Sequence, residues 1–253
     1  MSDLAGKLYI STIAGDAAAL ARAHGLGLEI AEFCTAYNMD EDFDAWDTRV
    51  KQQMCGLSRF VLHAPYSGLC PAAIDPMIVD VTKKRYAQAY RLMEGYGIQA
   101  MVVHSGFLPV LYDEDWFVTK SVAFWQAFLA ERPGASKLYL ENVFEQTPAL
   151  LNAIVRGVDD ERFKLCFDVG HAVLRSEGMT ATAWAEQAAP FLAHVHLNNN
   201  DGKHDAHNAL GDGVADVAAV IQSILALAPE AAFTIEAIDA ASSVHWMKAN
   251  GFL

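Results

Sequence analysis

The sequence predicts a (β/α)8 barrel, and three observations carry this prediction. Eight short apolar runs alternate with eight longer amphipathic stretches along the chain. The length of 253 residues is typical of this fold. The first apolar run is followed by Ser11-Thr-Ile-Ala-Gly-Asp16 instead of a Gly-rich phosphate loop, which disfavours the other candidate architecture, a doubly wound open sheet. No linker rich in Pro, Ser or Gly divides the chain, so we expect one domain over residues 1–253.

The expected strands are short, and most are rich in β-branched and aromatic residues, as buried parallel strands are. Such runs are bounded by polar or glycine-containing segments, which marks where each strand ends. In chain order the expected strands cover residues 7–12, 26–33, 59–66, 99–104, 137–143, 163–168, 193–197 and 232–236.

The expected helices lie between these runs. The third of them places Ile78, Val81 and Tyr86 at roughly helical spacing, which is the pattern of an amphipathic helix. Gly25 and Gly97 fall where two of the helices would stop. In chain order the expected helices cover residues 16–24, 44–54, 77–96, 116–131, 148–158, 181–193, 214–227 and 242–250.

Six expected strands, from the third to the eighth, each end in an imidazole or a carboxylate. The carboxyl ends of barrel strands converge on one mouth, and that face carries the active site in barrels of this kind. Buried carboxylates without a cation or hydrogen-bond partners are costly, so a purely structural role explains the set poorly. The six residues are His63, His104, Glu141, Asp168, His196 and Glu236. We therefore expect a metal site at the mouth, although His63 and His104 also fit a role in positioning a substrate oxygen.

Three further candidate ligands follow the sixth and seventh strands. His171, Asp205 and His207 add imidazole and carboxylate groups, which are the ligands that hard and borderline divalent ions prefer. His171 fits equally well as a group that orients a ligand or binds the substrate. His194 lies two residues before His196, hence on the same side of the strand and one layer deeper, so we interpret it as a core histidine.

Composition narrows the class of protein. The net charge of −13 works against binding of nucleic acid, whose affinity for proteins rests largely on Lys and Arg. The four cysteines form no CxxC pair, which argues against a disulfide framework or a thiolate zinc site. The first residues lack the features of a signal peptide, and no apolar run approaches the length of a membrane span. These features predict a cytoplasmic protein that does not enter a membrane.

The residues around the strand ends form an ordered set of short motifs. They are His63-Ala-Pro-Tyr66, Val103-His-Ser-Gly106, Leu140-Glu-Asn-Val143, Phe167-Asp-Val-Gly-His171, His196-Leu-Asn, Asp205-Ala-His207, Leu210-Gly-Asp-Gly213 and Thr234-Ile-Glu236. Taken in order, these motifs resemble those of the xylose-isomerase-like barrel superfamily. This superfamily includes sugar and sugar-phosphate isomerases and epimerases, and the apurinic endonucleases of the endonuclease IV type.

The isomerase branch of this resemblance implies one divalent ion, usually manganese, magnesium or zinc. Its ligands would be Glu141, Asp168, His196 and Glu236. The resemblance also implies that the two glutamates pass a proton through an enediolate of the substrate. Tyr66 or His171 would orient the sugar, and Phe107 would form an apolar wall of its site. Dimers and tetramers are common among such proteins, so a homo-oligomer agrees with the resemblance.

The endonuclease branch implies nine ligands around up to three zinc ions, which together clamp a phosphodiester. All nine have counterparts here, with Glu141 bridging two ions: His63, His104, Glu141, Asp168, His171, His196, Asp205, His207 and Glu236. Tyr66 falls where these endonucleases carry a tyrosine at the DNA.

The loops at the expected mouth distinguish the two branches. Residues 34–47 carry five acids and no Lys or Arg, and residues 105–115 also lack a base, so these loops would repel a duplex. They suit a small neutral ligand better, with Phe107, Leu108 and Trp116 as apolar walls. The sequence therefore favours an isomerase or epimerase of a small sugar or sugar-like substrate, with the endonuclease as the alternative. A sugar phosphate stays open, with Arg175 and Lys203 as the only nearby bases.

Overall fold

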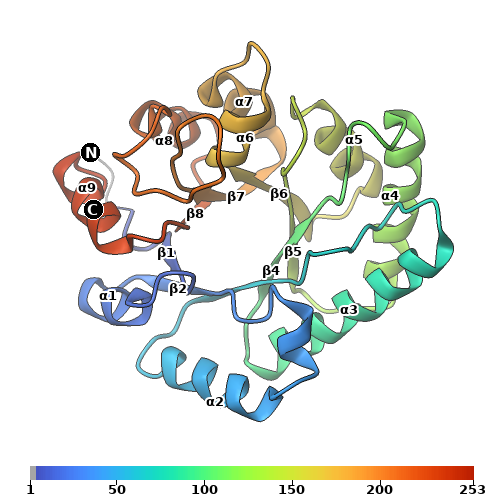
Figure 1. The fold of residues 1–253 in the computed structure, drawn as a ribbon, viewed down its shortest axis with the longest axis horizontal. Coiled ribbons are helices and arrows are strands. Elements are labelled where there is room, and N and C mark those ends of the chain that lie inside the picture. Colours follow the sequence, from blue (N-terminus) through green and yellow to red (C-terminus); the bar gives the residue numbers. More distant parts are fainter. Residues whose placement is uncertain (1–3) are drawn as a thin grey trace.

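The eight strands form one closed parallel barrel in chain order, as a computed structural model that describes residues 4–253 shows (Figure 1). The predicted (β/α)8 fold is therefore confirmed. Each strand pairs with its two neighbours, and the first strand closes the barrel on the last. The strands are β1 Leu8–Ser11, β2 Gly27–Ile30, β3 Phe60–His63, β4 Ala100–His104, β5 Lys137–Glu141, β6 Phe163–Asp168, β7 Leu192–Leu197 and β8 Ala232–Ile235.

The helices surround the barrel, and the last one, α9, contacts the first, α1 (Figure 1). The backbone N–H of Leu4 donates to the carbonyl of Phe252 (3.0 Å), which ties the start of the described chain to its end. The helices are α1 Ala17–His24, η1 Ala36–Met39, α2 Phe43–Met54, α3 Pro76–Gly95, α4 Glu114–Ala130, α5 Ala149–Val158, α6 Val169–Arg175, α7 Ala181–Ala188, η2 Ala189–Phe191, α8 Val217–Leu227 and α9 Ala240–Ala249. Within residues 4–253, no helix has the length and apolar content that crossing a bilayer requires.

The expected helix over 181–193 is too long. The α-helix α7 stops at Ala188, the 3-10 turn η2 follows, and β7 starts at Leu192. Pro190 lies in this turn, and proline lacks the N–H that would continue the helix. The last residues of the expected helix therefore belong to a strand.

The sequence did not predict α6, which begins directly after β6. Asp168 ends the strand and caps the helix, because its Oδ1 accepts a hydrogen bond from the backbone N–H of His171 (2.6 Å). The helix expected over residues 214–227 begins three residues too early, because α8 starts at Val217. Asp216 caps this helix, since its Oδ1 accepts a hydrogen bond from the backbone N–H of Ala219 (3.0 Å). A carboxylate at a helix start was a signal present in both segments.

The inside of the barrel has an apolar layer below a polar one. A small buried cluster, separate from the main core, joins one residue each from β3 to β6, with Tyr9 of β1 packed against it: Val61, Val102, Tyr139 and Cys166. Two positions further along the same four strands come His63, His104, Glu141 and Asp168. Side chains two residues apart point to the same face of a strand, so the apolar layer supports the polar one. The Tyr9 ring also explains Gly27, because a Cβ there would lie 2.2 Å from the ring.

The main hydrophobic core fills the space between the barrel and the helices. Trp184 of α7 stacks on Phe167 of β6 at 4.7 Å between ring centroids, and Trp125 of α4 lies 5.0 Å from the ring of Phe163. These fully buried aromatic rings fix the helices on β6, because burial of large apolar surfaces is the dominant favourable term in folding. The strand that carries Asp168 is thereby held in place.

Candidate metal and active site

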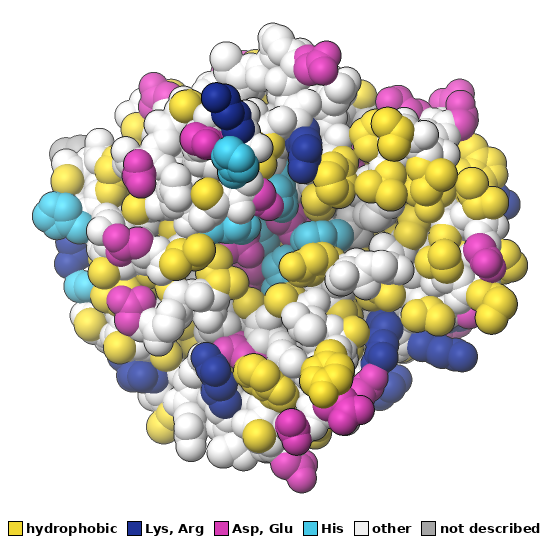
Figure 2. Space-filling view, viewed as in Figure 1, with side chains coloured by type: hydrophobic (Ala, Val, Ile, Leu, Met, Phe, Trp, Pro, Cys, Tyr) yellow, Lys and Arg dark blue, Asp and Glu magenta, His cyan; other side chains and the backbone are white. Residues whose placement is uncertain are grey.

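The polar layer opens into a hollow in the centre of the barrel mouth, where histidines and acidic side chains gather and lysines and arginines stay at the margin (Figure 2). The structure brings together all nine residues that the sequence singled out as ligands. They fall into three groups in which the potential ligand atoms lie within 4.8 Å of one another: His63, His104 and Glu141; Glu141, Asp168, His196 and Glu236; and His171, Asp205 and His207. A fourth group of this kind joins three of them to Glu29 of β2, which faces His63, His196 and Glu236.

The inner set consists of Glu141, Asp168, His196 and Glu236, and all four are buried. Nδ1 of His196 lies 3.1 Å from Oε1 of Glu141 and 3.1 Å from Oε2 of Glu236. The same nitrogen lies 3.9 Å from Oδ2 of Asp168. Three carboxylates thus converge on one imidazole nitrogen from three different strands or strand ends.

Glu141 also joins the inner set to the two histidines of β3 and β4. Its Oε2 lies 3.3 Å from Nε2 of His63 and 3.1 Å from Nε2 of His104. This buried oxygen nevertheless has no partner with hydrogen-bond geometry among the described residues. A carboxylate that faces two imidazole groups in this way can bridge two ions, one in each set.

The outer set consists of His171, Asp205 and His207 and lies on α6 and on the loop after β7. The carboxylate of Asp205 stands between the two imidazoles, with Oδ2 3.2 Å from Nε2 of His171 and Oδ1 3.6 Å from Nε2 of His207. The backbone of His207 has a φ of 45°, in the left-handed region that β-carbon-bearing residues seldom adopt. Strain of this kind concentrates at functional sites.

Three of the histidines are oriented in a way that suits metal ligands. Nδ1 of His63, His171 and His207 lies 2.8–2.9 Å from a backbone carbonyl oxygen. Only a protonated nitrogen can donate to a carbonyl oxygen, so Nδ1 carries a hydrogen and Nε2 is the nitrogen available to bind a metal ion. Metal-bound histidines usually donate their other N–H to an oxygen in this manner, which fixes the tautomer.

The distances within the three sets also fit a shared cation. Two ligands that each lie about 2.1 Å from one tetrahedral ion stand about 3.4 Å apart. The closest distances in the sets, 3.1 to 3.6 Å, surround that value. Carboxylate oxygens and imidazole nitrogens are ligands that zinc, manganese and magnesium accept. The residues present can therefore hold a divalent ion.

The pKa values of the site indicate the same preference for positive charge. Burial lowers the pKa of His63, but the combined attraction of Glu141, Glu236 and Glu29 outweighs burial and raises the pKa to about 9. Burial also opposes charge on His171, yet Asp168 and other carboxylates raise its pKa to about 10. Burial raises the pKa of Glu141, but the charge on His196 and its neighbours lowers it well below the usual range. A metal ion can replace the protons that such a cluster retains.

Neighbouring amide side chains hold the inner set in position. The side chain of Asn142 does not point at the site but bonds the backbone N–H and C=O of Asp168 (2.8 and 3.0 Å). Asn198 donates to Oδ2 of Asp168 (2.7 Å). Gly170 is required there, because a Cβ would lie 1.8 Å from the side-chain oxygen of Asn198. The glycine of the Asp-Val-Gly-His motif therefore gives room to a residue that orients the carboxylate.

One buried acidic residue in contact with the inner set escaped the sequence analysis. Glu29 of β2 is fully buried, and its Oε1 lies 3.1 Å from Nε2 of His196, on the ring edge opposite the inner set. Its Oε2 accepts a hydrogen bond from Thr234 (2.6 Å) and lies 3.3 Å from Nε2 of His194. The expectation that His194 lies in the core is confirmed, since it is fully buried. A charged residue inside the apolar run Leu28-Glu-Ile30 was the signal for this network.

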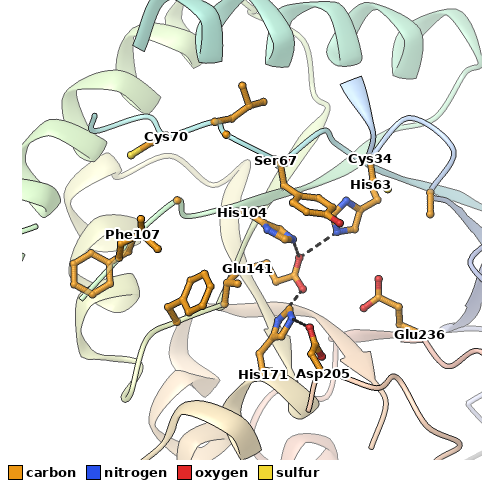
Figure 3. Close-up of a pocket in the computed structure, with 18 of the residues that line it drawn as sticks. Cys34, His63, Ser67, Cys70, His104, Phe107, Glu141, His171, Asp205 and Glu236 are labelled. Atoms are coloured by element: carbon orange, nitrogen blue, oxygen red, sulfur yellow. Dashed lines mark hydrogen bonds and ion pairs between the residues drawn. The ribbon is translucent and has the colours of Figure 1, made fainter. Parts of the chain in front are cut away.

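A cavity of about 780 Å³ opens above these sets, with Tyr66 and Phe107 among its lining residues. The ring of Tyr66 stacks on His104 at 4.4 Å, and Phe107 is almost fully buried against Phe117 at 5.0 Å. Leu108 lines the cavity as expected, whereas Trp116 does not and lies on α4 beside a second, smaller pocket. Figure 3 shows Glu141 between His104 and His171, with Phe107 on one side of it and Glu236 on the other.

The fold and the site define a (β/α)8-barrel protein with a carboxylate and imidazole site at its mouth. The chain belongs to the family described as xylose isomerase-like TIM barrel, which matches residues 19–250. The family expectation from the motifs is thereby confirmed.

Individual proteins are similar to this chain at low identity. The protein MJ1311 of Methanocaldococcus jannaschii is 25% identical over 225 residues, which cover 78% of this chain and 75% of that protein. A D-tagatose 3-epimerase-like protein has a TM-score of 0.77 at 20% identity and covers 96% of both chains. The TTHB071 protein of Thermus thermophilus, soaked with ZnCl2, has a TM-score of 0.77 at 22% identity over 96% of this chain and 97% of its own. The 3-keto-D-glucoside 4-epimerase YcjR of E. coli has a TM-score of 0.69 at 16% identity, and the match covers 96% of this chain and 99% of YcjR.

Proposed function

We propose that the chain is a divalent-metal-dependent isomerase or epimerase of a small sugar or sugar-like substrate. The observation that carries this proposal is the placement of Glu141 and Glu236 at the floor of the cavity, each 3.1 Å from Nδ1 of His196. Two carboxylates on different strands can exchange a proton with two positions of one small substrate. Two proteins of the same fold, a D-tagatose 3-epimerase-like protein and a 3-keto-D-glucoside 4-epimerase, support this class of reaction.

The roles of the residues follow from their positions. A divalent ion held by the inner set would polarise the substrate carbonyl and stabilise the negative charge that develops on its oxygen. One of Glu141 and Glu236 removes a proton from the carbon beside the carbonyl, and the other delivers a proton to complete the isomerisation or epimerisation. His171 or Tyr66 orients the substrate hydroxyls, because both line the cavity beside the glutamates.

The charge state of Glu236 suits a base. Burial raises its pKa, but the charge on His196 and the contact with that ring outweigh burial and lower the pKa below the usual range. The carboxylate is therefore ionised at neutral pH and ready to accept a proton. Its side chain is buried, which shields the developing charge from water.

The second candidate function is a zinc phosphodiesterase of the endonuclease IV type. It is favoured by the three ligand groups, which match the three-ion arrangement that the resemblance implies. It is opposed by the cavity walls, since among the residues the structure describes no lysine or arginine lines the cavity. Elemental analysis of protein purified without chelator separates the two. One equivalent of manganese, magnesium or zinc supports the isomerase, whereas two to three of zinc with cleavage of abasic DNA support the phosphodiesterase.

The proposal is tested with Glu236→Gln. The variant removes a proton acceptor but keeps the shape, so exchange of substrate carbon-bound hydrogen with deuterated water should fall by roughly 100- to 10,000-fold. Glu230→Gln serves as the control, because Glu230 is almost fully exposed and forms a surface ion pair with Lys7 (3.6 Å). Unchanged circular dichroism of both variants excludes misfolding. Exchange at the native rate in Glu236→Gln would remove Glu236 from the mechanism.

A further inference from the structure

The cavity above the ligand sets has two chemically different halves. Figure 3 shows the ionisable groups around Glu141 and Glu236, while Phe107 and Cys70 lie on the far side of Glu141. That far half is formed by apolar or aromatic side chains from the loops after β3, β4 and β5 and from α3. Six of them are Leu69, Ile78, Phe107, Leu108, Tyr112 and Phe144. We refer to these six residues as the apolar wall.

The cavity is larger than a free sugar needs. At about 30 Å³ per water molecule, a hexose that replaces six or seven waters occupies roughly 200 Å³. The cavity volume of about 780 Å³ is several times larger. A free sugar would therefore leave much of this open cavity to water.

The wall offers few groups for sugar hydroxyls or phosphates, because the one polar side-chain group among its six residues is the Tyr112 hydroxyl, which interacts with Cys70. Among the lining residues within 4–253 there is no lysine, arginine, asparagine or glutamine. The guanidinium of Arg175 does not line the cavity and lies 4.5 Å from the ring of Phe144 instead. A buried hydroxyl without a hydrogen-bond partner costs free energy, and a phosphate without a cation costs more. The wall therefore opposes a second polyol segment and a phosphoryl group.

The wall is also held in shape before a ligand arrives. Phe107 and Tyr112 both pack on the ring of Phe117, at 5.0 and 5.2 Å between centroids. The buried carboxylate of Glu145 accepts hydrogen bonds from the backbone N–H groups of Val143 (2.7 Å) and Phe144 (3.1 Å). A wall that is ordered in advance loses little conformational entropy on binding.

Exposed apolar side chains continue from the wall onto the surface. Leu108 is 39% exposed and Ile78 is 41% exposed, and Val110 and Leu111 beside them are exposed as well. Figure 2 shows hydrophobic side chains gathered on the right of the central hollow. Contiguous exposed apolar surface beside a polar site marks a place where a ligand is covered.

We propose that the substrate is a keto sugar glycoside, with a ketone at a ring carbon and an apolar, preferably aromatic, group on its glycosidic oxygen. This inference rests on the proposed function, since it places the sugar carbonyl at the inner set. The substituent lies on the apolar wall, and its burial supplies binding energy remote from the reacting carbons. The substrate is not phosphorylated.

The experiment measures binding of two hydroxamates to the manganese-loaded protein by calorimetry. A hydroxamate presents two oxygens on adjacent atoms in one plane, as an enediolate does. Acetohydroxamate probes the inner set alone, whereas 3-phenylpropanohydroxamate adds a phenyl group that reaches the wall. The phenyl compound should bind at least tenfold more tightly, because a buried phenyl ring removes a large apolar area from water.

Two variants localise the effect. Leu108→Ser and Ile78→Ser should each reduce the ratio of the two affinities at least threefold, and both positions are exposed enough to tolerate a polar side chain. Leu227→Ser is the matched control, since Leu227 is exposed at the end of α8 and does not line the cavity. It should change neither affinity.

The outcomes separate this inference from the proposed function. Equal affinities for the two compounds, or a ratio that both wall variants leave unchanged, would overturn the apolar subsite while the proposed function stands. Failure of both hydroxamates to bind would overturn the proposed function and this inference with it. A tenfold preference that both wall variants reduce supports the subsite.

Discussion

The inner and outer ligand sets differ in how the chain positions them. The side chains of the inner set, Glu141, Asp168, His196 and Glu236, are at most 7% exposed. In the outer set, Asp205 is 41% exposed and His207 is 23% exposed, although His171 is nearly buried. The inner residues end barrel strands or directly follow one, whereas Asp205 and His207 belong to a loop. The barrel strands therefore position the inner set, whereas the loop between β7 and α8 positions two of the three residues of the outer set.

This difference implies unequal rigidity and unequal electrostatic strength. The inner charges lie in a water-poor interior, where charge interactions are strong and an unpaired charge is costly. The loop that carries the outer set is braced by a bridge between Asn199 and Asn208, with N–H···O distances of 2.8 and 3.2 Å in both directions. We therefore expect the inner set to bind an ion more tightly and to tolerate change less well.

The largest effect is expected from Asp168→Asn. The amide removes one negative charge and one carboxylate ligand from the inner set. Loss of a group that only orients a ligand typically costs about 10- to 100-fold in metal affinity, so loss of a ligand should cost at least about 100-fold. Asparagine can still cap α6 in the place of the aspartate, so the fold should persist. Calorimetric titration with manganese measures the affinity, and the melting temperature of the metal-free protein reports on folding. An affinity within threefold of the native value would contradict the assignment of the inner set.

The second effect is a difference in pH dependence between the sets. Burial lowers the pKa of His171, but Asp168 and neighbouring carboxylates outweigh burial and raise it to about 10. Burial also lowers the pKa of His207, and there Glu236 and nearby carboxylates raise it above its ordinary value. A protonated imidazole cannot bind metal, so affinity is lost as the pH falls and gained as it rises toward these pKa values.

The number of histidines sets the slope of that dependence. The outer set has two histidines, and the inner set has one, His196. Burial lowers the pKa of His196, but nearby negative charge outweighs burial and raises the pKa well above its ordinary value. One proton is released per histidine, so outer affinity should rise up to about 100-fold per pH unit and inner affinity up to about tenfold. Zinc titrations at pH 7 and pH 8 measure both. Equal slopes would mean that the two sets do not act separately.

The third effect tests the support beneath the inner set. In Glu29→Gln a neutral amide replaces the carboxylate that lies 3.1 Å from Nε2 of His196, so the charge that orients this imidazole is lost. Metal binding should weaken about 10- to 100-fold. The control is Glu32→Gln, because Glu32 is also buried and bonds Thr12 (2.6 Å) but lies outside the three ligand groups. Equal affinities of the two variants would show that Glu29 does not position His196.

Sequence periodicity was sufficient to predict the barrel and the six polar side chains at its strand ends, because both follow from strands. The choice of four of them as one ligand set came from the family resemblance. A residue at the end of a buried run must appear at the mouth, and Glu141 and Asp168 do so as expected. Glu29 was missed since its role depends on the register of β2 against strands far along the chain, and one strand alone does not show which ring edge it meets. The short helix α6 was missed because Asp168 acts at once as a strand end and as a cap. The apolar wall needed the three-dimensional positions of three loops.

The smallest effect is expected from Asp205→Asn in the outer set. Because this carboxylate is partly exposed, water screens its charge and its loss costs little, so affinity for an outer ion should fall by less than about tenfold. Affinity at the inner set should not change. Asp212→Asn, at an exposed position of the same loop, controls for a general loss of negative charge. Zinc titration that follows each equivalent separately gives both values. If Asp205→Asn weakens the inner ion as strongly as Asp168→Asn does, the two sets form one coupled centre, and the loop contributes to it as much as the barrel.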